Sequence, residues 1–100
     1  MLIFPLKKQW YEKIKSGEKT IEYREVKPYW TKRFNKEGFT NFGIRQKQLL
    51  VECRLRLGYT NQYLSARIMK IVVVNGKDTD IAIDKPVYAI HLIDVKEIEK

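Results

Sequence analysis

The segment from Leu49 to Leu57 places an apolar side chain at every second position and, after Leu50, a charged side chain at each position between. Leu49, Val51, Cys53, Leu55 and Leu57 occupy every second position, and three of the four positions between them are charged. Successive side chains of a strand point to opposite faces, so this pattern predicts a strand with one face in a core and a charged outer face. Cys53 falls on the apolar face, where we expect a buried, unreactive thiol.

The rest of the chain supplies partners for this strand. Trp10 and Ile14 are spaced i,i+4, as are Trp30 and Phe34, and each pair predicts one buried helix face. Pro28 suits the first turn of the second helix. The four-residue apolar run 71–74 predicts burial on both faces of its strand. The expected helices are 9–16 and one from residue 28 onward, and the expected further strands are 2–6, 19–24, 65–74 and 87–95.

Five strands, two early helices and no repeated strand–helix–strand unit predict a mainly antiparallel α+β fold. The strands alternate so regularly that we expect a small closed or nearly closed β-barrel, because closure removes exposed sheet edges. With 100 residues, the chain is long enough for one modest core, so residues 1–100 are expected to form a single domain. Residues 37–48 show neither the helical nor the strand spacing of apolar residues, and they are expected to form a loop that covers a cleft.

The net charge of +8 is concentrated in one half of the chain. Residues 1–56 contain 14 Lys and Arg against 6 Asp and Glu, whereas residues 57–100 contain six of each. A one-sided basic surface attracts polyanions, which favours an RNA or nucleotide-like partner. No apolar run is long enough to span a membrane, and the single cysteine excludes a disulfide framework. We therefore expect a cytoplasmic protein without a metal site or cofactor.

The most informative eight residues are 17–24, Gly-Glu-Lys-Thr-Ile-Glu-Tyr-Arg. On a strand, Glu22 and Arg24 share one face, and Lys19 in the preceding turn can lean over it. Such charges are costly to desolvate unless they pair with one another or with a ligand. Two interpretations follow: an ion cluster that pins a helix to a sheet, or a ligand site.

These residues carry a family resemblance. Gly17, Lys19, Glu22 and Arg24 fit the pattern Gly-x-Lys-x-x-Glu-x-Arg, which resembles the signature of the ASCH domain in the PUA-like superfamily. The resemblance extends upstream to residues 6–14 and downstream to residues 27–33, with Tyr29, Lys32 and Arg33. It implies a small β-barrel with flanking helices and a cleft for RNA or a nucleoside.

As an RNA-binding domain, the chain would use its basic cleft in a defined way. Lys19 and Arg24 would contact phosphate or a base edge, and Lys32 and Arg33 would extend the positive surface. Tyr23, Tyr29 or Trp30 would stack an exposed base. Glu22 would orient the two cations or accept a hydrogen bond from an exocyclic amine.

Two alternatives belong to other functional classes. Some ASCH relatives are amidohydrolases that act on N4-acetylcytidine, and others are ribonucleases, so Lys19 and Glu22 are candidate catalytic residues. The amidohydrolase nucleophile is a threonine at the position of Glu22, which argues against that activity here. A metal-independent hydrolase of RNA or a modified nucleoside remains the alternative, although we lean against catalysis. The further alternative is a regulatory protein-interaction domain.

Overall fold

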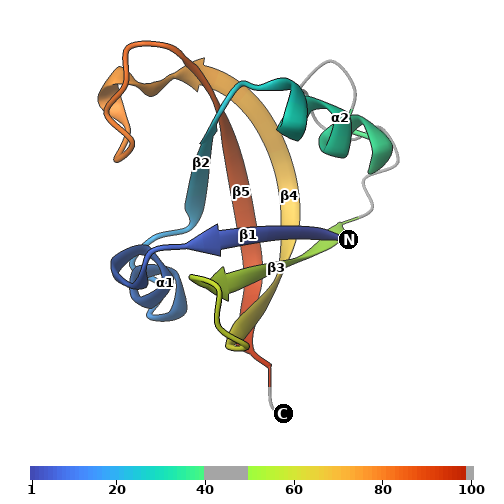
Figure 1. Ribbon diagram of the computed structural model, residues 1–100, viewed down its shortest axis with the longest axis vertical. Coiled ribbons are helices and arrows are strands. Elements are labelled where there is room, and N and C mark those ends of the chain that lie inside the picture. The colour runs from blue at the N-terminus through green and yellow to red at the C-terminus, as the bar shows by residue number, and fades with distance from the viewer. Residues whose placement is uncertain (40–49, 99–100) are drawn as a thin grey trace.

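The chain folds into one curled sheet with two helices packed against it (Figure 1). The computed structural model describes residues 1–39 and 50–98. Most of the loop expected at 37–48 therefore lies outside the described residues. The elements, in chain order, are β1 (Leu2–Leu6), α1 (Lys8–Lys15), β2 (Ile21–Glu25), α2 (Pro28–Lys36), β3 (Val51–Leu57), β4 (Tyr63–Asn75), the 3-10 turn η1 (Gly76–Asp78) and β5 (Pro86–Glu97).

The sheet has five strands in the order β1-β3-β4-β5-β2. β1 pairs with β3 in parallel, and every other pair is antiparallel. β4 shows two register shifts opposite β5, and such irregularities bend a strand. The sheet curls into a half-barrel, with β1 and β3 crossing the direction of β5 and the upper part of β4 (Figure 1). The α+β class, the five strands and the two helices in the N-terminal half are confirmed. The free edges of β1 and β2 define the seam of the half-barrel.

The inner face of the sheet holds the core. On β3, Val51, Cys53 and Leu55 are buried, as the alternation predicted. Burial raises the pKa of the Cys53 thiol to about 12, so it is protonated at neutral pH. α2 begins at Pro28 and inserts Trp30 and Phe34, whose rings stack at 5.8 Å between centroids. α2 thereby covers one end of the half-barrel.

α1 differs from its prediction in the side chain that it buries. Tyr11 and Ile14 are buried, whereas Trp10 is only partly buried against the core. The i,i+4 pair was right about Ile14 and wrong about Trp10, because α1 is rotated so that Tyr11 faces inward. The helix ends where Gly17 takes a φ of +85°, a left-handed conformation that glycine adopts readily. The partly exposed Trp10 ring is available at the surface.

The end of β4 also differs from its prediction. Ile71 is fully buried, but Val73 on the same face is 41% exposed. The prediction that both faces of residues 71–74 are buried was therefore wrong. In the segment that follows β4, Gly76 lies close to Ile83 and Val87. A Cβ on Gly76 would come within 2.7 Å of the Ile83 carbonyl oxygen, so only glycine fits here without a shift.

His91, on β5, is half-buried. It pairs with Ile21 across the sheet, and Lys70 lies opposite on β4. Burial and the nearby Lys70 charge lower the pKa of His91 below 6.5. Within residues 1–39 and 50–98, no helix is long and apolar enough to cross a membrane.

Candidate functional site

The junction between α1 and β2 positions the charged triplet. After Gly17, the Lys19 backbone N–H donates to the Lys13 carbonyl at 3.0 Å, which ties the turn to α1. Glu22 and Arg24 lie opposite the buried residues Ile90 and Tyr88 of β5. Both side chains therefore face the inside of the half-barrel, on the shared face that the sequence predicted.

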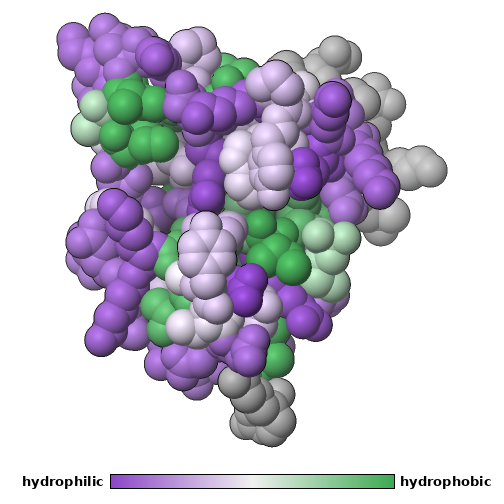
Figure 2. Space-filling view, in the orientation of Figure 1, coloured by the Kyte–Doolittle hydropathy of each residue, from purple (hydrophilic) through white to green (hydrophobic). Residues whose placement is uncertain are grey.

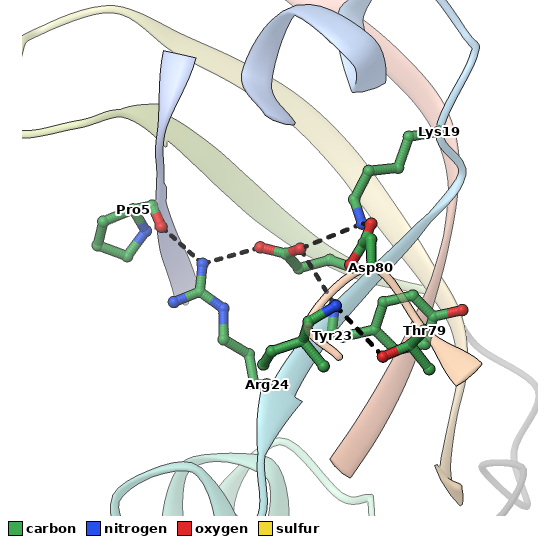
Figure 3. A network of polar contacts seen from close by, with 8 residues as sticks. Pro5, Lys19, Tyr23, Arg24, Thr79 and Asp80 are labelled. Carbon is green, nitrogen blue, oxygen red and sulfur yellow. Dashed lines mark hydrogen bonds and ion pairs between the residues drawn. The ribbon is translucent and has the colours of Figure 1, made fainter. Parts of the chain in front are cut away.

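Glu22 is the centre of a network of polar contacts (Figure 3). It is 5% exposed. Its Oε1 accepts from the Tyr23 backbone N–H at 3.1 Å and lies 3.7 Å from Lys19 Nζ. Its Oε2 lies 2.9 Å from Arg24 Nη2. Both carboxylate oxygens are engaged, so Glu22 orients the two cations.

Arg24 connects the two edges of the sheet. Its Nη2 also donates to the Pro5 carbonyl on β1 at 2.6 Å (Figure 3). The guanidinium lies over the rings of Phe4 and Trp30, at 5.5 and 5.3 Å from their centroids. Pro5 lacks an N–H, which suits the edge of a sheet. A side chain thus spans the seam where no backbone ladder forms.

Lys19 pairs with a residue that the sequence analysis did not identify. Its ammonium forms an ion pair with Asp80, in the segment after η1 (Figure 3). The ammonium also lies over the rings of Trp10 and Tyr23, at 5.3 and 5.0 Å from their centroids. Lys19 is 9% exposed. The only sequence signal for Asp80 was the acidic pair Asp78 and Asp80 in a polar loop, far from residue 19 in the chain.

A hollow of about 400 Å³ opens beside Lys19. Figure 2 shows the indentation on this face, between the segment that follows β4, at the upper left, and α1, at the lower left. Glu22 and Arg24 do not line this hollow and lie behind it as its support. Its lining comprises Trp10, Lys13, Glu18, Lys19, Thr20, Ile21, Tyr23, Asp78, Thr79 and Asp80.

The other three predicted site residues line a different hollow. Tyr29, Lys32 and Arg33 surround a space of about 500 Å³ beside α2. The Arg33 guanidinium lies 3.4 Å from the centroid of the Tyr29 ring and donates to the Tyr29 carbonyl at 2.9 Å. The single cleft expected from the sequence is thus present as two hollows. Met1, Leu2, Ile3, Lys36 and Glu37 complete the lining of the second one.

The first hollow combines aromatic rings with charged and polar side chains. Burial, together with the Asp80 charge, raises the pKa of the Tyr23 hydroxyl, so Tyr23 stays neutral. Across the described part of the chain, no three His, Cys, Asp or Glu side chains gather closely enough to hold a metal ion. Two aromatic rings, an ammonium and a carboxylate instead offer stacking and hydrogen bonding to a flat polar ligand.

Fold and site together define a small α+β domain with a curled half-barrel, a seam bridged by charge, and an aromatic-lined hollow beside it. None of the protein-family models, curated proteins or solved structures compared with this chain matches it.

Proposed function

We propose that this protein binds single-stranded RNA by taking one unstacked nucleobase into the hollow beside Lys19. The observation that carries the proposal is the composition of that hollow. The rings of Trp10 and Tyr23 line it, and the ammonium of Lys19 lies over both. Sequence-specific RNA recognition commonly stacks splayed bases on aromatic side chains and reads their edges by hydrogen bonds.

Asp80 is the edge-reading group in this proposal. One of its oxygens, Oδ2, pairs with Lys19, and Oδ1 makes no hydrogen bond within residues 1–39 and 50–98. Its side chain is 31% exposed and lines the hollow. A carboxylate oxygen accepts from an exocyclic amine, so the site favours cytosine, adenine or guanine over uracil. Asp80 takes the acceptor role that the sequence analysis gave to Glu22.

Lysines and arginines outside the hollow supply attraction to the RNA backbone. Lys13 lies at the rim, and Lys32 and Arg33 line the second hollow beside α2. Exposed cations of this kind contact phosphates without reading sequence. The net charge of +8 brings the RNA to the protein.

We also propose that the chain is an ASCH-like domain whose Glu22 and Arg24 act as scaffold. The Gly-x-Lys-x-x-Glu-x-Arg pattern and the curled sheet both support this assignment. A hydrolase that used Glu22 as a base would need a free carboxylate oxygen. Both oxygens are held by Lys19, Arg24 and the Tyr23 amide, so the geometry favours binding over hydrolysis.

Fluorescence anisotropy with labelled octacytidylate and octauridylate RNA tests the proposal. Trp10→Ala should weaken octacytidylate binding about tenfold, the size of one lost base stack. Val73→Ala, which changes an exposed side chain outside both hollows, should bind like the wild type. Asp80→Asn should reduce the preference for octacytidylate over octauridylate. Equal binding by wild type and Trp10→Ala, or absence of binding, would overturn the proposal.

A further inference from the structure

A row of arginine and tyrosine side chains runs along the outer face of the sheet and into the turn between β3 and β4. We call Arg54, Arg56, Tyr59 and Tyr63 the arginine–tyrosine row. Arg56 on β3 pairs directly with Tyr63 on β4, on the face opposite the buried Leu55 and Leu64. None of the four residues lines the hollow beside Lys19 or the hollow beside α2.

Each guanidinium in the row lies near an aromatic ring. The Arg54 guanidinium is 6.0 Å from the centroid of the Tyr63 ring, and that of Arg56 is 5.7 Å from the same centroid. Arg56 also lies 5.9 Å from the centroid of the Tyr59 ring. A guanidinium near a ring keeps donors in its own plane for further partners. Rings alternating with cations are the recurrent surface for single-stranded nucleic acid.

The backbone of Tyr59 is held in place by hydrogen bonds, whereas its side chain is exposed. The Arg56 Nε donates to the Thr60 carbonyl at 2.7 Å, and its Nη2 donates to the Tyr59 carbonyl at 3.1 Å. These bonds fix the turn between β3 and β4, while the Tyr59 side chain remains 85% exposed. Packing within the described residues does not account for this ring, and an exposed aromatic on a fixed backbone can stack on a base.

Arg54 has hydrogen-bonding capacity that the described fold leaves unused. Its Nε is buried without a partner, and the side chain makes no hydrogen bond or ion pair within residues 1–39 and 50–98. A buried unsatisfied donor on a charged group is costly. Arg54 is only half-buried, and a phosphate matches the planar fork formed by its terminal nitrogens.

The turn that carries Tyr59 is bonded to the end of β1, which leads into α1. The Gly58 N–H, in the same turn as Tyr59, donates to the Leu6 carbonyl at 2.8 Å. α1, which carries Trp10, begins two residues later at Lys8, and the end of β3 lies beside α1 in Figure 1. An RNA strand that leaves the hollow can therefore pass over this turn.

We infer that the arginine–tyrosine row is a second contact surface for the same RNA strand. Tyr59 stacks a nucleobase outside the hollow, and Arg54 binds a backbone phosphate. This inference rests on the proposed function, because it assigns the path of an RNA whose first base is already bound. A single nucleotide fills the hollow without reaching the row. Comparing a mononucleotide with an oligonucleotide therefore distinguishes binding at the row from binding in the hollow.

The experiment compares cytidine 5′-monophosphate with octacytidylate on the full chain. Tyr59→Ala should weaken octacytidylate binding about tenfold and leave monophosphate affinity unchanged. Tyr59→Phe, which keeps the ring, should bind like the wild type. Arg54→Gln should weaken octacytidylate binding. It should also lower the slope of log affinity against log salt by about 0.7. Arg67→Gln, an outward change on β4 outside the row, serves as the charge-matched control.

Wild-type affinity for octacytidylate in both Tyr59→Ala and Arg54→Gln would overturn the inference and leave the proposed function standing. Equal weakening of monophosphate and octacytidylate by Tyr59→Ala would also overturn it, because the row would then not be a separate surface. A change of oligomeric state without a change of RNA affinity would assign the row to self-association and overturn it as well. If neither ligand binds the wild type, both the inference about the row and the proposed function of the hollow are overturned.

Discussion

Arg24 donates to the carbonyl oxygen of Pro5 at 2.6 Å, across the seam where β1 and β2 form no ladder. The same Nη2 holds Glu22 at 2.9 Å, and Glu22 is 3.7 Å from Lys19. The contacts that join the sheet edges are thus continuous with those that position the hollow. Glu22 therefore links the seam of the half-barrel to Lys19, which lines the hollow.

Removing Arg24 should loosen the seam. We expect Arg24→Ala to lower the free energy of unfolding by about 2 to 3 kcal/mol, because the charged hydrogen bonds to Pro5 and Glu22 are lost and Glu22 stays buried. Urea unfolding followed by circular dichroism measures the change. Arg67→Ala, which removes an exposed arginine on β4, should change stability by about 0.5 kcal/mol or less. Equal stability of the two variants would show that Arg24 does not hold the seam.

A methyl group at Gly76 should disturb the segment that carries Asp80. Its Cβ would meet the Ile83 carbonyl oxygen and the Val87 side chain, both at 2.7 Å. Overpacking of this kind costs about 1 to 3 kcal/mol, and we expect it to shift Asp80 away from Lys19. Thermal unfolding and nucleotide binding should both weaken in Gly76→Ala. The neighbouring Lys77→Ala should change neither, and indistinguishable behaviour of the two variants would contradict this account.

Lys32 and Arg33 should contribute to RNA affinity without reading sequence. For the double variant Lys32→Ala, Arg33→Ala we expect weaker binding to every RNA sequence. The slope of log affinity against log salt should fall by about 1.4, since each phosphate contact on a single strand contributes about 0.7. Lys8→Ala combined with Lys77→Ala removes the same charge outside both hollows. If both pairs lower the slope equally, only net charge matters and the α2 hollow has no special role.

His91 should make stability fall in mild acid. Its pKa lies below 6.5 in the folded chain because of burial and Lys70. The unfolded chain therefore binds the proton more readily, and stability present at neutral pH is lost as the pH falls below 6.5. The single histidine gives one imidazole signal, so its titration by NMR should show a midpoint below 6.5. Urea unfolding of His91→Gln should lose this part of the pH dependence, and an NMR midpoint at or above 6.5 would be inconsistent with the structure.

Local patterns predicted much of this fold. Alternation predicted β3 and the burial of Cys53, and Pro28 marked the start of α2. The i,i+4 rule misplaced Trp10. Ile14 can share a buried helix face with either Trp10 at i,i+4 or Tyr11 at i,i+3, and only contact with the sheet selects Tyr11 as the inward residue. The parallel pairing of β1 with β3 had no local signal, since strand direction depends on the path of the whole chain.

The candidate site shows the same division between local and long-range contacts. Lys19, Glu22 and Arg24 are close in sequence, and strand periodicity brings them together. Asp80 reaches Lys19 from 61 residues away, and Pro5 reaches Arg24 from β1. Neither partner could be predicted without the curl of the sheet. The curl also separates Tyr29, Lys32 and Arg33 from the triplet and makes two hollows of the expected single cleft.

The most direct measurement of the central claim follows the two tryptophan indole N–H signals by NMR during a titration with cytidine 5′-monophosphate. Trp10 lines the hollow, whereas Trp30 is on the buried face of α2, lines neither hollow and serves as an internal control. The account predicts that the Trp10 signal shifts with a saturating dependence on ligand while the Trp30 signal stays in place. A Trp10 signal that does not move up to millimolar ligand would contradict a nucleobase site beside Lys19.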